Sequence, residues 1–244
     1  MAEPDLHPSF FPATSRGLVL GPREIHLWAI PLTCDPRPYE LLLSDAERSR
    51  ASRLHVRDHQ RRFSISHGAM RSILADYVDS DPRGLEFRVG PRGKPYLRDH
   101  KELFFNLSHS SQIALLALAP AEVGVDLERI RPLENLADIA ARQFSAAECA
   151  RIRELEGEAR LRGFYRVWTC KEAFIKALGG GFSIPLDAFD VAVEGAHAIL
   201  SFRDRDDDPG DWTMADVAPA ADYAAALAIR GSGFAIRRFR AVEI

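Results

Sequence analysis

WTCKEAFIK, residues 168–176, lies at the centre of the longest helical pattern in this chain. The pattern runs from about residue 157 to residue 178, and three glycines, 179–181, end it. Apolar side chains recur at helical spacing and leave Glu172 and Lys176 at the edge of the expected core. The two residues are four apart with the acid first, so they share one face of the helix.

Two interpretations of Glu172 and Lys176 are open. They can form one helix-stabilising ion pair, or Glu172 can bind a metal ion while Lys176 contacts a phosphate or transfers a proton. A charged pair at the boundary of a core needs a reason, and this favours the second interpretation.

Strands and helices on both sides of this helix follow an order that predicts an α+β fold. Two capping boxes, Ser44 to Glu47 and Ser145 to Glu148, predict the starts of helices. Helical sequence is expected from the first box to about residue 77, in two pieces, and as a short helix after the second box. Strands are expected at residues 24–30, 85–89, 103–106, 113–119, 123–127, 189–193, 199–202, 223–229 and 234–239.

This order predicts two α+β halves in tandem, residues 1–119 and 120–244, with the join near Pro120. The sequence shows no residue-level repeat, so the order of the elements is the sole indication of a duplication.

The composition excludes several classes of function. Hydrophobic residues make up 46% of the 244 residues and the net charge is -3, so no basic excess points to nucleic acid. The longest apolar run is far shorter than the roughly 20 residues that cross a bilayer. No signal peptide is expected, and a cytoplasmic location is the default. The three cysteines lack C-x-x-C spacing and are expected to be buried thiols.

Asp126 and Glu128 stand at the end of an expected strand, in Gly-Val-Asp-Leu-Glu. Residues two apart on a strand point to the same face, so the two carboxylates converge. Two nearby like charges are costly unless a cation or a proton lies between them, and a few hard oxygen ligands suit magnesium. A chance pair of acids at an exposed strand end is the alternative.

Two further stretches could bind phosphate. Phe105 to Ser110, FNLSHS, ends a strand with Ser108 and His109, whose hydroxyl and imidazole can donate to phosphate oxygens. Lys94 adds a cation on a tight turn in Gly-Lys-Pro. A histidine satisfied in a turn and a surface lysine are the ordinary alternatives.

Arginine is concentrated early in the chain. On one continuous helix Arg50, Arg53, Arg57 and Arg61 would line a single face. Such a face is either solvated or a docking surface for an acidic partner.

Five motifs occur together in one order: G-K-P at 93–95, N-L-S-H-S at 106–110, G-V-D-L-E at 124–128, F-S-x-x-E at 144–148 and W-x-x-K-E-A-x-x-K-x-x-G at 168–179. This set resembles the Sfp-type 4′-phosphopantetheinyl transferases over roughly residues 40–190. The resemblance implies a pseudo-dimer of two similar α+β halves that acts as a monomer, with coenzyme A and Mg²⁺ in the cleft between the halves.

The resemblance also implies roles for individual residues. Asp126, Glu128 and Glu172 would bind Mg²⁺, and Lys176 would contact the transferred phosphate. Glu148 matches an acid that some members are thought to use in metal coordination or water activation. Coenzyme A would be held through its 3′-phosphate or diphosphate by a basic and polar set: Arg50, Arg53, Lys94, Ser108 and His109. Glu47 stands where other members carry a basic residue.

The implied reaction moves phosphopantetheine from coenzyme A to a serine of an apo acyl or peptidyl carrier protein and releases 3′,5′-ADP. The serine needs a base, directly or through water, and Glu172 could serve as base or as metal ligand. Two other functions stay open: a binding module without turnover, and a nucleotide hydrolase that uses the D-x-E site. No G-x-x-x-x-G-K-[ST] motif supports a P-loop hydrolase.

Overall fold

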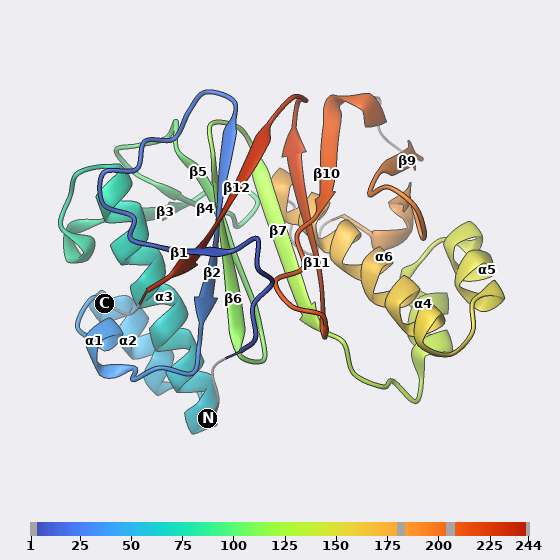
Figure 1. Cartoon of the computed structure of the whole chain (residues 1–244), viewed down its shortest axis with the longest axis horizontal. Coiled ribbons are helices and arrows are strands. Elements are labelled where there is room, and N and C mark those ends of the chain that lie inside the picture. Colours follow the sequence, from blue (N-terminus) through green and yellow to red (C-terminus); the bar gives the residue numbers. More distant parts are fainter. Residues whose placement is uncertain (1–3, 180–183, 204–207, 243–244) are drawn as a thin grey trace.

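The computed structural model describes residues 4–179, 184–203 and 208–242. Its strands form a central layer, with helix α3 on one side and helix α6 on the other (Figure 1). The α+β class expected from the sequence is confirmed. Within the described ranges, no helix is long and apolar enough to cross a membrane.

The first part of the chain contains an arm strand, a long strand, three helices and two strand pairs. Their bounds are β1 (Phe11–Ala13), β2 (Glu24–Pro31), α1 (Arg37–Glu40), α2 (Asp45–Ser52), α3 (Arg57–Tyr77), the 3₁₀ turn η1 (Pro82–Gly84), β3 (Phe87–Val89), β4 (Pro95–Leu97), β5 (Phe104–Ser110) and β6 (Ile113–Ala119).

The second part contains the long helix with its flanking strands. The bounds are β7 (Val123–Arg129), α4 (Leu136–Gln143), α5 (Ala146–Glu154), α6 (Gly157–Leu178), the 3₁₀ turn η3 (Leu186–Ala188), β8 (Phe189–Val191), β9 (Ile199–Phe202), the 3₁₀ turn η4 (Pro209–Asp211), β10 (Trp212–Asp216), β11 (Tyr223–Arg230) and β12 (Ala235–Ala241).

Both predicted capping boxes are present. The hydroxyl of Ser44 accepts from the amide of Glu47 at the start of α2, and Ser145 does the same for Glu148 at the start of α5. Helix α6 has the expected bounds and ends at Gly179, whose φ of 69° is left-handed and favours glycine. Gly180 and Gly181 lie outside the described residues.

The two larger sheets have the strand orders β1-β12-β2-β6-β5 and β10-β11-β7. Strand β12 comes from the end of the chain and pairs in parallel with β2, so the last strand lies in the sheet of the first part. The expected join near Pro120 falls in the turn between β6 and β7. Strand β6 is buried along its whole length, because it is paired on both edges and covered on both faces.

The order of elements in the first part recurs in the second. In each part a strand leads to a capping-box helix, a long helix, a 3₁₀ turn, a two-stranded pair and two antiparallel strands. The sheet orders β2-β6-β5 and β7-β11-β10 correspond strand by strand.

The arginine-rich segment is divided, as expected, into two helices. Helix α2 ends at Ser52 and α3 begins at Arg57, so Arg50 and Arg57 lie on different helices and do not share one continuous face. The sequence patterns did not predict β1, β4 and β10. Strand β4 has three residues and begins with a proline, and it exists through its pairing with β3.

Candidate active site

The site is built where α6 packs directly on β7. Gly124 makes this approach possible, because a Cβ atom there would lie 2.0 Å from the carbonyl oxygen of Ala173 on α6. Two residues further along β7, Asp126 therefore faces the same helix that carries Glu172 and Lys176.

Asp126 is the buried centre of the site, with 4% of its surface exposed. Its Oδ1 lies 2.5 Å from the ammonium of Lys176 and 3.1 Å from the hydroxyl of Ser108, and both groups donate to it. Its Oδ2 is buried and has no hydrogen-bond partner within the described part of the chain. Because a buried carboxylate oxygen needs a partner, Oδ2 is open to a cation.

Glu128 and Glu172 are half-buried and close enough to Asp126 to be affected by its charge. Burial raises the pKa of Glu128, and the negative charge of Asp126 raises it further, while a hydrogen bond from Ser110 lowers it. Burial and the charge of Asp126 also raise the pKa of Glu172, against the lowering effect of Lys176. Glu128 and Glu172 therefore each feel the negative charge of Asp126, but within the described residues no three acids come close enough together to form a metal cluster.

Alternate residues of β5 join the two sheets at this place. Asn106 accepts from the amide of Val125 through its side-chain oxygen at 2.8 Å. Ser108 donates to Asp126, and Ser110 donates to Oε2 of Glu128 at 2.9 Å. The roles of Asn106 and Ser110 were missed from the sequence, although the N-x-S-x-S spacing puts all three on one face of a strand.

Ser108 and His109 point to opposite sides of β5, so they do not form one phosphate-binding pair. Ser108 is buried against Asp126, and its hydroxyl also receives a hydrogen bond from Lys176 at 3.1 Å. His109 is exposed and lines a cavity of about 740 Å³ instead. Of the two residues, His109 is therefore the one placed to contact a phosphate in this cavity.

The cavity beside His109 is basic. Arg50, His59, Arg62 and Arg131 line it together with His109, and Glu128 links it to the carboxylates. Partial burial and the positive charges of Lys176 and Arg62 lower the pKa of His109. Arg50 lies over the ring of Phe63 at 5.3 Å and has no ion pair within the described ranges, so its charge is available to an anion.

Lys94 and Arg53, two predicted coenzyme A contacts, do not line the basic cavity. Lys94 donates to the carbonyl oxygens of Val123 at 2.8 Å and Ala177 at 2.9 Å, which ties β7 to the end of α6, and burial lowers its pKa to about 8. Lys94 lines a second cavity, of about 650 Å³, together with Gly179. Arg53 follows the last residue of α2 and contacts Ser49.

Glu148 is not brought to the three carboxylates. Its side chain is 2% exposed, and its oxygens accept from the amides of Ser145 and Val191 and lie beside the ammonium of Lys171. This full set of contacts corrects the expectation that Glu148 coordinates the metal or activates water.

Comparison with known proteins assigns the family. The model of the 4′-phosphopantetheinyl transferase superfamily matches residues 122–228, which include β7 and α6. The 4′-phosphopantetheinyl transferase HetI of Nostoc sp. is 36% identical over 225 residues, which cover 89% of this chain and 92% of that protein. The 4′-phosphopantetheinyl transferase Sfp of Bacillus subtilis is 27% identical, over 74% of this chain and 84% of its own length.

This chain therefore belongs to the 4′-phosphopantetheinyl transferase superfamily.

Proposed function

We propose that this chain transfers the 4′-phosphopantetheine arm of coenzyme A to a serine of an apo acyl or peptidyl carrier protein and releases 3′,5′-ADP. The observation that carries the proposal is Asp126: Lys176 holds one of its oxygens, while the other is buried without a partner beside two further carboxylates. Family membership supports the type of reaction. We further propose that the two halves form a pseudo-dimer, that one monomer supplies the whole site, and that the protein acts in the cytoplasm.

Asp126, Glu128 and Glu172 offer hard oxygen donors of the kind that Mg²⁺ prefers. In the described residues, no three His, Cys, Asp or Glu side chains converge closely enough to hold a metal ion. Oδ2 of Asp126 is nevertheless a buried oxygen in need of a cation, and Glu128 and Glu172 are half-buried acids whose pKa values are raised by the charge of Asp126. We propose that Asp126, Glu128 and Glu172 hold Mg²⁺, which would neutralise charge on the phosphoryl oxygens when bound.

The basic cavity would hold the nucleotide end of coenzyme A. Arg50, Arg62 and His109 present positive or hydrogen-bonding groups to it, and Glu128 connects it to the metal ligands. A diphosphate placed along this path would leave the transferred phosphorus close to Lys176. The ammonium of Lys176, which already compensates Asp126, can donate to the phosphoryl oxygens as their charge develops.

A proton must leave the attacking serine. Glu172 is a half-buried carboxylate on α6, so it can accept a proton as well as bind Mg²⁺. Glu148 is unsuited to this task, because its oxygens are already engaged by two amides and Lys171. We propose that Glu172 accepts the proton, directly or through water.

Mass spectrometry of apo carrier proteins tests the function. Wild-type protein with coenzyme A and Mg²⁺ should add one phosphopantetheine to the carrier serine, and EDTA or Asp126→Ala should prevent it. Coenzyme A binding without any modified carrier would indicate a binding module. Loss of phosphate from coenzyme A without a carrier would indicate a hydrolase.

A further inference from the structure

Lys171, inside the long helix, is a buried charge that the proposed reaction does not use. Its side chain has no exposed surface, although it directly precedes Glu172 in the sequence. Burial lowers the pKa of Lys171, while the charge of Glu148 raises it. Burying an ammonium group costs free energy unless the group is paired and hydrogen-bonded.

Lys171 joins three elements of the second half. Its ammonium lies 2.9 Å from Oε1 of Glu148 and donates to the carbonyl oxygens of Leu186, at 2.6 Å, and Phe189. It also lies 4.5 Å from the centre of the Phe189 ring. These contacts tie α6 to the start of α5 and to the entry into β8.

Glu148 completes the connection from the other side. Its Oε2 accepts from the amide of Ser145 at 3.0 Å, which closes the capping box of α5. Its Oε1 accepts from the amide of Val191 on β8 at 2.8 Å. Glu148 and Lys171 therefore form one buried unit that fixes α5, α6 and β8 relative to one another.

The first half contains the same unit. Arg71 on α3 lies 2.6 Å from Oε2 of Glu47, which closes the capping box of α2. The guanidinium of Arg71 donates to the carbonyl oxygens of Pro82, at 2.7 Å, and Leu85, at 3.2 Å, and lies 5.0 Å from the centre of the Phe87 ring. A buried cation paired with the glutamate of a capping box therefore occurs in both halves, at corresponding places in the order of elements. The pair can be mutated in either half.

Of the two pairs, only Lys171 with Glu148 is next to residues that the proposed reaction uses. Because a helix turns by about 100° per residue, Glu172 and Lys176 lie roughly 100° and 140° around the axis from Lys171. A rotation of α6 would therefore move both side chains relative to Asp126 on β7. The corresponding residues after Arg71 are Ser72 and Asp76, neither of which lines the basic cavity.

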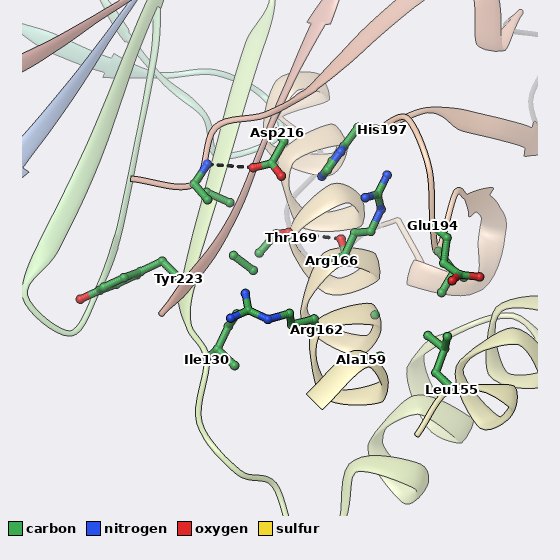
Figure 2. Close-up of a pocket in the computed structure, with 15 residues that line it drawn as sticks. Ile130, Leu155, Ala159, Arg162, Arg166, Thr169, Glu194, His197, Asp216 and Tyr223 are labelled. Carbon is green, nitrogen blue, oxygen red and sulfur yellow. Dashed lines mark hydrogen bonds between the residues drawn. The ribbon is translucent and has the colours of Figure 1, made fainter. Parts of the chain in front are cut away.

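Packing alone leaves room on another face of α6. A cavity of about 280 Å³ is lined by Arg162, Arg166 and Thr169 of α6 and by Tyr223 of β11 (Figure 2). By helical periodicity, these three helix residues lie on the side roughly opposite Lys171. The contacts that fix the rotation of α6 therefore include those of Lys171, on the side away from this cavity.

We propose that Lys171 and Glu148 are a positioning pair that fixes the rotation of α6 so that Glu172 and Lys176 reach Asp126. The inference rests on the proposed function, since its effect is measured through transfer. It assigns Glu148 a role at a distance from the reacting atoms.

Steady-state kinetics of Lys171→Met test the proposal. We expect kcat to fall by about tenfold to a hundredfold, because small displacements of reacting groups have effects of this size. KM for coenzyme A should stay within about twofold, since Arg50 and His109 belong to the other half. Lys171→Arg, the cation used at the corresponding position of α3, should retain most of the activity. Arg71→Met is the matched control, which should lose stability but keep its kcat.

A double variant separates positioning from catalysis. Lys171→Met alone leaves the carboxylate of Glu148 buried and unpaired, whereas Lys171→Met with Glu148→Gln removes both charges. A positioning pair predicts that the double variant is more stable to urea and has a higher kcat than Lys171→Met. If Glu148 took part in the chemistry, the double variant would be no more active, and the proposal would be overturned.

Two further results would contradict the positioning role of Lys171 and Glu148. The proposal is wrong if folded Lys171→Met keeps the wild-type kcat, or if Arg71→Met lowers kcat equally. Should Lys171→Met fail to fold, Glu148→Gln provides the same test with a milder change. Wild-type protein without transfer would contradict the proposed function, and active wild-type protein with fully active variants would contradict the positioning role alone.

Discussion

Helices α3 and α6 occupy corresponding places in the two halves, yet only α6 carries reactive groups. Each has a buried cation paired with the glutamate of a capping box, Arg71 with Glu47 and Lys171 with Glu148. One and five residues after the cation, α3 has Ser72 and Asp76, whereas α6 has Glu172 and Lys176. The scaffold is thus shared, and the chemistry depends on a few substituted positions.

The strands under these helices differ in the same way. Strand β7 carries Asp126 and Glu128 near its end, whereas β2 carries no acid after Glu24 at its start. The comparison indicates that the carboxylates are placed in one of two parts that share an order of elements, while the other part supplies cations from α2 and α3. Changes at matched positions should therefore affect stability in both halves but catalysis in one.

The largest effect is expected from Lys176→Ala. Lys176 compensates Asp126 at 2.5 Å and is positioned to stabilise charge on the transferred phosphate. We expect kcat to fall by about 10²- to 10³-fold, as for other groups that stabilise developing charge. Asp76→Ala is the matched change on α3 and should leave kcat near wild type. Equal losses in the two variants would show that the halves do not differ as described.

A smaller effect is expected from Gly124→Ala. The added Cβ would lie 2.0 Å from the carbonyl oxygen of Ala173, so β7 and α6 must separate. We expect a stability loss of about 1–3 kcal/mol from overpacking, measured by urea unfolding. The kcat should fall by about tenfold, because Asp126 moves away from Lys176.

Gly68→Ala is the matched change in the first half. Its Cβ would lie 2.5 Å from the carbonyl oxygen of Tyr39, so a similar loss of stability is expected. The kcat should be unchanged, since α3 carries no reactive group. A Gly124→Ala variant that loses stability but keeps its full kcat would contradict the proposed dependence of the site on this close approach.

His109→Ala should discriminate between two donors. A charge-assisted hydrogen bond to phosphate is worth about 1.5–3 kcal/mol, so KM for coenzyme A should rise about tenfold. KM for dephospho-coenzyme A, which lacks the 3′-phosphate, should change little. Equal increases for both donors would place His109 away from the 3′-phosphate.

The same residue should make binding depend on pH. Burial and neighbouring cations lower the pKa of His109 in the free protein, and a bound phosphate would raise it. Binding then takes up a proton, so coenzyme A affinity should be highest at low pH and fall as pH rises through the pKa of the complex. Calorimetry in buffers of different ionisation enthalpy measures this uptake, which His109→Ala should remove.

The smallest effect concerns docking of the carrier. Arg57 is exposed at the start of α3 and could attract an acidic partner, whereas Arg61 donates to the carbonyl oxygen of Cys34. We expect Arg57→Glu to raise carrier KM by about two- to threefold at low salt, and less at high salt. Arg153→Glu on α5 is the control. Equal changes in both variants would indicate a general charge effect.

Local patterns predicted much of the fold and the core of the site. Helix α6 and strand β6 have the expected bounds, because both are long and strongly patterned. The capping boxes predicted two helix starts, and their geometry is local. Strand periodicity paired Asp126 with Glu128 and helix periodicity paired Glu172 with Lys176, while the family resemblance implied that the two pairs share one site.

Long-range contacts account for what the sequence did not reveal. The burial of Lys171 beside Glu172 was not predicted, because its partners Glu148 and Leu186 are distant in the sequence. Lys94 resembled a surface cation, yet it bridges the carbonyl oxygens of Val123 and Ala177. The pairing of β12 with β2 likewise depends on residues about 200 positions apart.

The central claim is that the second half alone holds a metal ion, through Asp126. Electron paramagnetic resonance of Mn²⁺ added to the protein with coenzyme A measures this directly, with no need for turnover. We predict one bound ion in the wild type and in Asp76→Ala, and at least about tenfold weaker binding in Asp126→Ala. Unchanged Mn²⁺ binding by Asp126→Ala would contradict the account.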